Sequence, residues 1–478
     1  MVRTFLVVTC AAALLCPSGA EAQWFDVYGT QKLVSGTPAA PLLKNVSCQP
    51  VVVDHSIELE EAILQAVCAN PQARQAWAAA RAQAAAVGLD EAAYLPTLSA
   101  TGGYERDTLS TTYDASAFGQ GSLRSSQNSS SKYGMLNLSW VLFDFGKRRA
   151  ALRQASQLLA AANATQDDVL QTVFFDAARA YYAVRDAQAS VDAARQTEDI
   201  AKESLAEASA KHNAGAGTLS DQLQAQTTYR RAVIDRVNAE GDARTAIGTL
   251  AVAMGFDANT PVRVAPSEPT TSSAEFSEGV DQLIEEAKAR QPKLVAARAK
   301  LEAARANVEA ARAEGRPTIS LLGSLTQNNP SYQQQPQSLP ITGSRGSTIG
   351  IQVTIPLFEG FASDYRVAQA QAQADAQEAD MQNTDLQVSL DVWRSYQSLQ
   401  ADMANMDNSK ALLADAQRSL GIARGRYKAG VGTVTELLNS QTALADAQKQ
   451  RVLAVSKWRT ARLRLASSLG NLGLWNNK

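Results

Sequence analysis

The sequence predicts a mainly α-helical chain that also carries membrane β-strands and consists of two similar halves. Three observations lead to this fold class. The 478 residues contain only 6 Trp, 12 Tyr, 11 Phe and 15 Pro, and alanine is the most frequent residue, which favours long helices. A set of residues recurs along the chain at a nearly constant spacing. Short segments between the helical stretches alternate apolar and polar residues, which is the two-residue period of a strand.

The composition excludes several classes of protein. The 45 Lys and Arg nearly balance the 47 Asp and Glu, so the net charge of −2 argues against a nucleic-acid-binding protein, which usually carries a basic face. Only two histidines are present, His55 and His212, and neither has a second ligand at metal-binding spacing. No nucleophile or acid–base pair stands at a spacing that catalysis would use. We therefore expect a protein that is not an enzyme and needs no cofactor or metal.

The N-terminus has the pattern of a secretory signal peptide. Arg3 precedes the apolar stretch Phe5–Leu15, and the small residues Ala20 and Ala22 follow. We therefore expect residues 1–22 to be removed. Lipoprotein processing at Cys16 is the alternative, although that reaction favours a small residue before the cysteine, where this chain has leucine. No later apolar run approaches the roughly 20 residues of a membrane-spanning helix.

Two cysteines remain after this removal, Cys48 and Cys68. Because exported proteins meet an oxidising compartment, we expect a disulfide between them, with a structural role. Two free or buried thiols are the alternative, and the sequence alone leaves their separation in space open.

The second half of the chain repeats the first. The repeated pairs on the long helical stretches, each 215 positions apart, are Val173 and Val388, Asp176 and Asp391, Arg179 and Arg394, and Tyr181 and Tyr396. Further upstream the spacing is 221, as between Pro71 and Pro292. The change in spacing places a longer connection between the two strand-like segments of the first half. Chance does not produce this ordering, so we expect two structural repeats.

The same order of elements is expected in each half. The first-half elements are an alanine-rich helix carrying a proline (57–88), two strand-like segments (97–109 and 133–143), a very long helix (147–212), a Gly-x-Gly turn and a return helix ending near residue 254. The second-half counterparts are 280–313, 318–326, 348–358, 361–427 and a return helix ending near residue 469. The expected domains are a signal peptide (1–22), an N-terminal extended segment (23–56), a first repeat (57–255), a linker (256–278), a second repeat (279–470) and a C-terminal tail (471–478).

The very long helix exceeds the needs of a single globular core. Residues 147–212 span roughly 100 Å at about 1.5 Å per residue. Val169, Val173, Ala177 and Tyr181 follow one another every four residues, which forms a narrow apolar stripe with small members. Such a stripe suits helices that pack side by side in a coiled-coil wall. A helical hairpin docked on a compact domain is the alternative.

The strand-like segments have one apolar and one polar side. Ile349, Ile351, Val353 and Ile355 share a face, and the residues between them are small or polar, as expected for a strand between lipid and water. Four such strands cannot close a barrel, and an open edge in lipid leaves backbone groups unsatisfied. We therefore expect several copies to share one barrel, with three copies giving twelve strands. The Ser- and Gly-rich residues 113–131 are expected to form a long external loop.

Together these features resemble the TolC family of outer-membrane export and efflux proteins. The motifs that carry the resemblance are the helix break at Asn70-Pro71, Tyr94-Leu95-Pro96, Leu142-Phe143-Asp144-Phe145-Gly146 with Leu357-Phe358-Glu359-Gly360, and the turns at 213–221 and 428–436. The resemblance implies a homotrimer with a twelve-stranded outer-membrane barrel and a long periplasmic α-helical barrel. It also implies an exit duct that receives protein or small toxic molecules from an inner-membrane pump (ABC or RND type) and a periplasmic adaptor.

The resemblance further implies functional residues at the two Gly-x-Gly turns, which would form the periplasmic tip. The expected adaptor contacts are Gly215, Gly217, Thr218, Gly430, Gly432 and Thr433. Gate contacts are expected at Asp221 and Tyr427, as a hydroxyl-to-carboxylate link, and at Glu436, as an acidic ring in the pore. The sequence departs from the family pattern at Gly432, which replaces a gate arginine, and at Asn439, which replaces a second acidic residue.

Two questions stay open at this level. A periplasmic coiled-coil adaptor or scaffold is the alternative function, because it would share the signal peptide and the helical hairpins. The basic residues Lys147-Arg148-Arg149 either meet lipid head groups beside the strands or form a solvated face.

Overall fold

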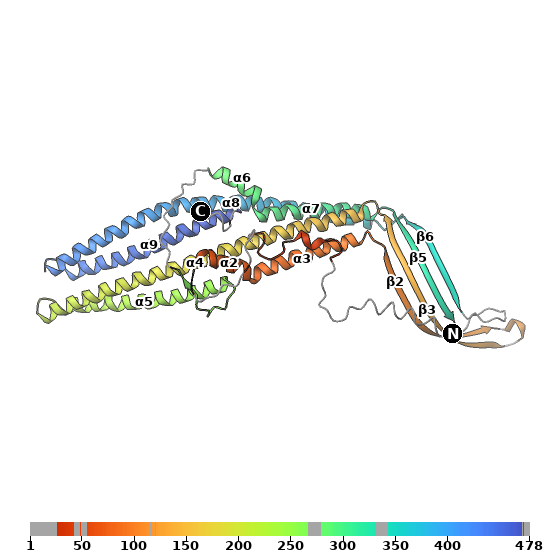
Figure 1. Cartoon of the computed structure of the whole chain (residues 1–478), viewed down its shortest axis with the longest axis horizontal. Helices are drawn as coiled ribbons and strands as arrows, with labels where there is room; N and C mark the ends of the chain where they lie inside the picture. Colours follow the sequence, from red (N-terminus) through yellow and green to blue (C-terminus); the bar gives the residue numbers. More distant parts are fainter. Residues whose placement is uncertain are drawn as a thin grey trace.

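The computed structural model describes residues 26–42, 48, 55–114, 116–119, 121–265, 279–330, 343–470 and 472. These residues form a long rod with helices at one end and a four-stranded sheet at the other (Figure 1). The predicted signal peptide and most of the predicted linker and C-terminal tail lie outside the described residues. No helix in the described ranges combines the length and the apolar character that crossing a membrane requires.

The longest helices reproduce the predicted repeat. Helix α4 (Lys147–Asn213) and helix α8 (Ala362–Lys428) each have 67 residues, and each packs against a shorter antiparallel partner, α5 (Leu219–Ala253) or α9 (Val434–Ser468). All four bounds of the second hairpin stand 215 positions after those of the first. The two hairpins run side by side along the rod and end at the same tip (Figure 1).

Each predicted proline-bearing helix is in fact two helices. The first half has α2 (Leu59–Ala69) and α3 (Pro71–Ala92), and the second half has α6 (Val280–Arg290) and α7 (Pro292–Glu314). Proline occupies the first turn of α3 and of α7, and the residue before it is extended, with ψ values of 128° and 118°. A proline ring clashes with helical geometry at the preceding residue, so each proline-bearing stretch is divided at its proline, which confirms the helix break expected at Asn70-Pro71.

The sheet is antiparallel throughout, in the order β2-β3-β5-β6. Its strands are β2 (Thr97–Asp114), β3 (Ser122–Phe143), β5 (Thr318–Pro330) and β6 (Ser344–Thr354). The prediction of a long loop at residues 113–131 was wrong. The β2–β3 ladder continues to Asp114 opposite Ser122, and only a short connection with one turn of 3-10 helix (Ser116–Phe118) joins the strands. Residues 122–131 include no proline, so their serine-rich composition does not interrupt the ladder.

The helical core is narrow and built on small side chains. Val173, Ala177, Tyr181 and Val184 of α4 are buried, which confirms the predicted stripe. Helix α4 contacts α3 on one side and α7 on another, while α5 covers the half of α4 nearer the tip. A two-residue parallel bridge between β1 (Ser56–Ile57) and β4 (Arg263–Val264) crosses the middle of the first half.

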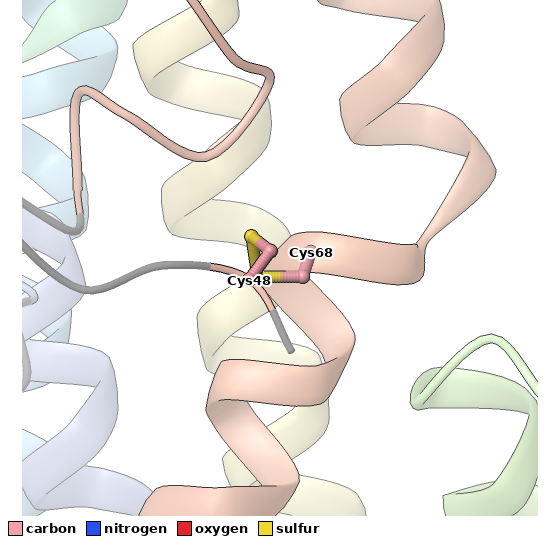
Figure 2. The surroundings of a disulfide bond; sticks show 2 residues. All are labelled: Cys48 and Cys68. Atoms are coloured by element: carbon pink, nitrogen blue, oxygen red, sulfur yellow. A yellow bond between two sulfur atoms is a disulfide. The ribbon is translucent and has the colours of Figure 1, made fainter. Parts of the chain in front are cut away.

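An N-terminal segment, residues 26–42, lies over α3 and α4. The indole Nε1 of Trp77 donates to the backbone oxygen of Ser35 at 2.8 Å. The buried Gln166 side chain donates to the backbone oxygen of Pro38 at 3.0 Å. Beyond this segment the structure joins Cys48 to Cys68 of α2 in a disulfide, with a Cα–Cα distance of 5.6 Å (Figure 2). The N-terminal extension is therefore fixed to the middle of the rod.

Candidate functional site

The strand register gives the sheet one apolar and one polar side. Residues opposite each other in a ladder share a face, and successive residues alternate between faces. We call the first side the apolar face. Its residues are Leu98 and Ala100 on β2, Leu136, Leu138 and Trp140 on β3, Ile319, Leu321, Gly323 and Leu325 on β5, and Ile349, Ile351 and Val353 on β6. The opposite, polar face carries mainly Ser, Thr, Asn and Gln, so the predicted alternation holds across all four strands.

A bulge places Phe143 on the apolar face where the sheet meets the helices. The β3–β5 register shifts between Val141 and Phe143, so that Phe143 rather than Leu142 stands opposite Ile319. A bulge adds one residue and so exchanges the faces of every residue beyond it. Without it, Phe143 would point to the polar face. The bulge thus adds an aromatic ring to the helical end of the apolar face.

Exposed aromatic residues gather at this junction. Phe143 and Phe145 touch with ring centroids 4.7 Å apart, and Phe358 and Phe361 touch at 5.6 Å. All four rings are largely exposed, as is Trp140. Aromatic side chains at the edge of an apolar band are typical of membrane–water interfaces. The apolar face therefore has the edge expected of a sheet that ends at a bilayer surface.

The turns that link strand to long helix share an unusual backbone. Two successive residues have positive φ in each repeat: Phe145 (52°) with Gly146 (97°), and Gly360 (61°) with Phe361 (66°). Glycine takes this left-handed region without cost, whereas a residue with a side chain is disfavoured there. The repeats place their one glycine at different positions of the same turn. The phenylalanine at the other position makes the ring contact that compensates for its backbone strain.

The basic residues after the first turn have local partners. Nε of Arg148 bonds the Asp144 carboxylate at 2.7 Å, and its guanidinium lies over the Tyr94 ring, 4.8 Å from the centroid. Lys147 pairs with Glu314 of α7 at 3.0 Å. These contacts favour a role in holding the strands to the helices, rather than in binding head groups.

The opposite end of the rod holds the two Gly-x-Gly turns. Gly215 and Gly430 have φ of 73° and 75°, the left-handed conformation that ends a helix. A Cβ at Gly217 would lie 3.2 Å from the backbone nitrogen of His212, and a Cβ at Gly432 would lie 3.0 Å from that of Tyr427. The first glycine is thus required for its conformation and the second for a close approach. This confirms the turn geometry but leaves adaptor contact a prediction.

Threonine begins the return helix after each turn. The Thr218 hydroxyl accepts from the backbone nitrogen of Asp221 at 3.1 Å, and the Thr433 hydroxyl accepts from that of Glu436 at 3.1 Å. The Asp221 carboxylate returns the bond by accepting from the backbone nitrogen of Thr218 at 3.3 Å, which completes a capping box. Both threonines therefore have a structural role that the resemblance did not assign.

The three gate candidates lie at this tip, but each is held by its nearest neighbours. Glu436 pairs with Arg426 at 3.1 Å across its own turn. Tyr427 is only 5% exposed, and the Lys211 ammonium of the other hairpin lies 3.8 Å from its ring centroid. Burial, together with the charges of Asp221 and Glu207, raises the pKa of the Tyr427 phenol. Asp221 therefore influences Tyr427 through its charge, while its carboxylate caps a helix.

Sequence reasoning missed a charged cluster between the two hairpins. Arg424 of α8 bonds Glu203 and Glu207 of α4, the latter at 3.3 Å, and Lys428 bonds Glu207 at 3.1 Å. Nearby, the Gln441 amide of α9 donates to the Ser204 hydroxyl in a buried contact. Comparing the repeats would have given a signal, because the counterpart of Glu207 at the 215 spacing is the apolar Ile422.

Comparison with known proteins decides the family. The model of the family described as "Outer membrane efflux protein" matches residues 62–256 and 283–471. The chain belongs to the outer membrane efflux protein family. It is 33% identical over 418 residues to protein CyaE of Bordetella pertussis, covering 87% of this chain and 85% of the relative. It is 23% identical over 355 residues to outer membrane protein TolC of Escherichia coli, covering 72% and 70% of the two chains.

The fold agrees with that of solved outer-membrane proteins. The outer membrane protein VceC of Vibrio cholerae superposes with a TM-score of 0.72 at 20% identity, over 86% of this chain and 96% of that chain. The chain therefore has the TolC-like fold of duplicated halves, and its family places it in the outer membrane. Its sheet lies at the membrane and its helical rod extends into the periplasm. Among the described residues there is no group of three or more side chains that would hold a metal ion.

Proposed function

We propose that the protein is the exit duct of a tripartite export system, which passes cargo from an inner-membrane pump and a periplasmic adaptor to the exterior. The observation that carries this proposal is the sheet. One face is apolar over four strands and the other is polar, and among the described residues of the single chain no further strand pairs with the outer strands β2 and β6. A lipid-facing sheet needs its edges paired, so the wall of the duct must come from several chains.

The helical hairpins supply a second argument for a homotrimer. Within one chain, the Gln441 amide of α9 donates to the Ser204 hydroxyl of α4, between the two hairpins. The 215 spacing makes Gln226 of α5 the counterpart of Gln441, and Ser419 of α8 the counterpart of Ser204. Gln226 and Ser419 are both exposed in the single chain. We infer that α5 of one copy packs against α8 of the next, as α9 packs against α4, and that three copies close a ring of twelve strands.

The tip supports the role of a docking and gating end. Both Gly-x-Gly turns lie at the far end of the rod from the sheet (Figure 1). Pocket-like space between the tips of α5 and α9 is lined by Leu219, Leu223 and Leu438, with Thr and Asn residues beside them. We propose that an adaptor contacts these turns, and that Asp221, Tyr427 and Glu436 lie at the gate.

Engineered cysteines test the assembly directly. We expect Gln226→Cys with Ser419→Cys to form covalent dimers and trimers in isolated outer membranes after mild oxidation, because the two positions face each other between copies. The matched control is Ser204→Cys with Gln441→Cys, which should cross-link within one chain and leave a single-copy band. A single-copy band for both pairs, or recovery of the protein in the soluble periplasmic fraction, would favour the adaptor alternative.

A further inference from the structure

Where the strands continue beyond the apolar residues, basic and acidic side chains lie on opposite sides of the sheet. Glu105, Arg106 and Asp107 are consecutive on β2, so Arg106 continues the apolar face while the two acids continue the polar face. Lys132 of β3 stands opposite Tyr104, and Arg345 of β6 stands opposite Gln327, both on the side of the apolar face. The described basic residues at this level thus face outward, and the acidic residues face inward.

The three basic residues lie close together on the sheet. Ladder spacings of about 4.8 Å between strands and 3.3 Å per residue put the Arg106 and Lys132 backbones about 8 Å apart. The same spacings put Lys132 and Arg345 about 12 Å apart. All three side chains are exposed, and Tyr104 beside them is 65% exposed. Three cations and an aromatic ring therefore share one small patch, which we call the outer basic patch.

The patch stands one membrane thickness from the aromatic junction. Lys132 is eleven residues before Phe143, which is about 36 Å along the strand and about 28 Å along the membrane normal at a typical tilt of about 40°. The apolar band of outer-membrane strands is about 25 Å tall. When the aromatic junction lies at the periplasmic surface, the outer basic patch lies at the head groups of the outer leaflet.

The basic side chains of the patch are not neutralised by acidic side chains of the described residues. Within the described ranges, neither Arg106, Lys132 nor Arg345 forms an ion pair. Arg124, farther along the same face, instead donates from Nε to the Ser110 hydroxyl at 3.0 Å. A cation at the edge of hydrocarbon extends toward the nearest anion or water. Guanidinium groups bind phosphate oxygens with two parallel hydrogen bonds.

We propose that the outer basic patch binds phosphate groups carried by glycolipid head groups of the outer leaflet. The acids on the polar face explain why the patch serves lipid rather than cargo, because a passing solute meets Glu105 and Asp107 instead. The bound lipid would fix the depth of the sheet in the membrane. This inference rests on the outer-membrane location of the chain and is independent of which cargo it exports.

The test measures binding of a labelled diphosphorylated lipid A to the purified full-length protein in detergent. We expect the variant carrying Arg106→Gln, Lys132→Gln and Arg345→Gln to lose about fivefold in affinity per cation, and on the order of a hundredfold in total. Lipid A stripped of both phosphates should bind the wild type and the variant equally weakly. Millimolar inorganic phosphate should not displace the lipid.

Matched variants separate this proposal from a general charge effect. Arg124 lies on the same face but about 26 Å from Lys132 along β3, so Arg124→Gln should leave binding unchanged. Arg106→Lys with Arg345→Lys keeps the charge and should retain most of the affinity. If the triple variant fails to assemble, Lys132→Gln alone should show the fivefold loss. Equal loss with Arg124→Gln, equal binding of dephosphorylated lipid, or displacement by inorganic phosphate would each overturn the proposal.

Discussion

At the residue scale, acidic and basic residues at the tip make different kinds of contact: the acidic gate candidates bond within their own hairpin, whereas certain basic residues bond across to the other hairpin. Asp221 caps α5, and Glu436 pairs with Arg426 across its own turn. The connections between hairpins come instead from Lys211, which donates to the backbone oxygen of Tyr427, and from Arg424, which bonds two glutamates of α4. A carboxylate in the first turn of a helix is satisfied by its own backbone before a distant partner competes for it. Cations that cross between the hairpins therefore help to hold them together at the tip, beside the buried contact of Gln441 with Ser204.

Removing the charge of Arg424 should loosen the tip. Arg424→Gln leaves Glu203 without its partner and Glu207 with Lys428 alone. The Oε2 atom of Glu207 is already buried without a hydrogen bond, so losing another donor there is costly. We expect more frequent open states and a higher mean conductance in planar lipid bilayers.

Arg418→Gln is the matched control for this experiment. Arg418 lies on the same helix but is highly exposed, and within the part of the chain that the structure describes it pairs with Asp415 of its own helix alone, at 3.7 Å. Such a surface pair contributes little. Conductance should stay at the wild-type level in this variant. The same conductance in both variants would rule out a gating role for the charged cluster.

At the element scale, the sheet shows how register turns a weak local pattern into a defined surface. Each strand alone alternates as a soluble hairpin would. The ladder then aligns four alternating strands so that their apolar residues fall on one side, and the bulge between Val141 and Phe143 puts Phe143 in place of Leu142 on that side at the end of β3. A shift of one residue in any pairing would move a whole strand to the other face. The pairing register of the four strands is therefore stronger evidence for a lipid-facing surface than the alternation within any single strand.

Neighbouring positions on β6 test these faces. Ile351→Lys puts a charge on the apolar face, opposite Leu321, whereas Gln352→Lys puts the same charge on the polar face. A lysine in the lipid-facing band costs about 2–4 kcal/mol near the bilayer midplane. We expect Ile351→Lys to reduce the amount of assembled protein in the outer membrane severalfold, measured by immunoblotting of fractionated cells. Gln352→Lys should assemble normally, and equal yields would contradict the assignment of faces.

At the scale of the whole molecule, the two halves match closely in their helical hairpins and differ in the length of their strands and in the N-terminal segment. The helical hairpins keep the 215 spacing in every bound, because each must present the same surface to its neighbour. The β2–β3 hairpin extends beyond the corresponding strands of the second half, and the N-terminal segment over α3 and α4 ends in a disulfide to α2. These additions belong to one half only.

Loss of the disulfide should weaken the middle of the rod. It closes a loop with a sequence separation of 20 residues, and a loop of this size contributes about 3 kcal/mol in the chain-entropy model. We expect Cys68→Ser to lower the thermal midpoint of helix loss, followed by circular dichroism. Wild-type protein treated with a reductant should match the variant, which serves as the control.

Thiol titration gives an independent check of the same bond. Cys10 and Cys16 lie in the predicted signal peptide, so protein isolated from the outer membrane should contain only Cys48 and Cys68. Unfolded, unreduced protein should then show no free thiol. Two free thiols per chain would show that the bridge is absent.

The sequence by itself determined the two halves, the helical hairpins and the alternating strands, because each depends on spacing between residues that are near in the chain. The repeat spacing located both Gly-x-Gly turns, and the Asn70-Pro71 motif marked the break between the two helices that precede the strands. Serine-rich residues 122–131 were mistaken for a loop. Composition indicates the preference of a segment for turns, but it does not show whether a neighbouring strand is in place to pair with the segment.

Only the tertiary structure decided which residues meet. The charged cluster around Arg424 joins positions more than 200 residues apart, and the outer basic patch depends on the register of separate strands. The Thr-x-x-Asp and Thr-x-x-Glu spacings at 218–221 and 433–436 indicate the helix starts, whereas the pairing of Glu436 with Arg426 across the turn came only from the structure. Spacing along a chain defines the face of an element, but contacts between elements depend on how those faces are brought together in three dimensions.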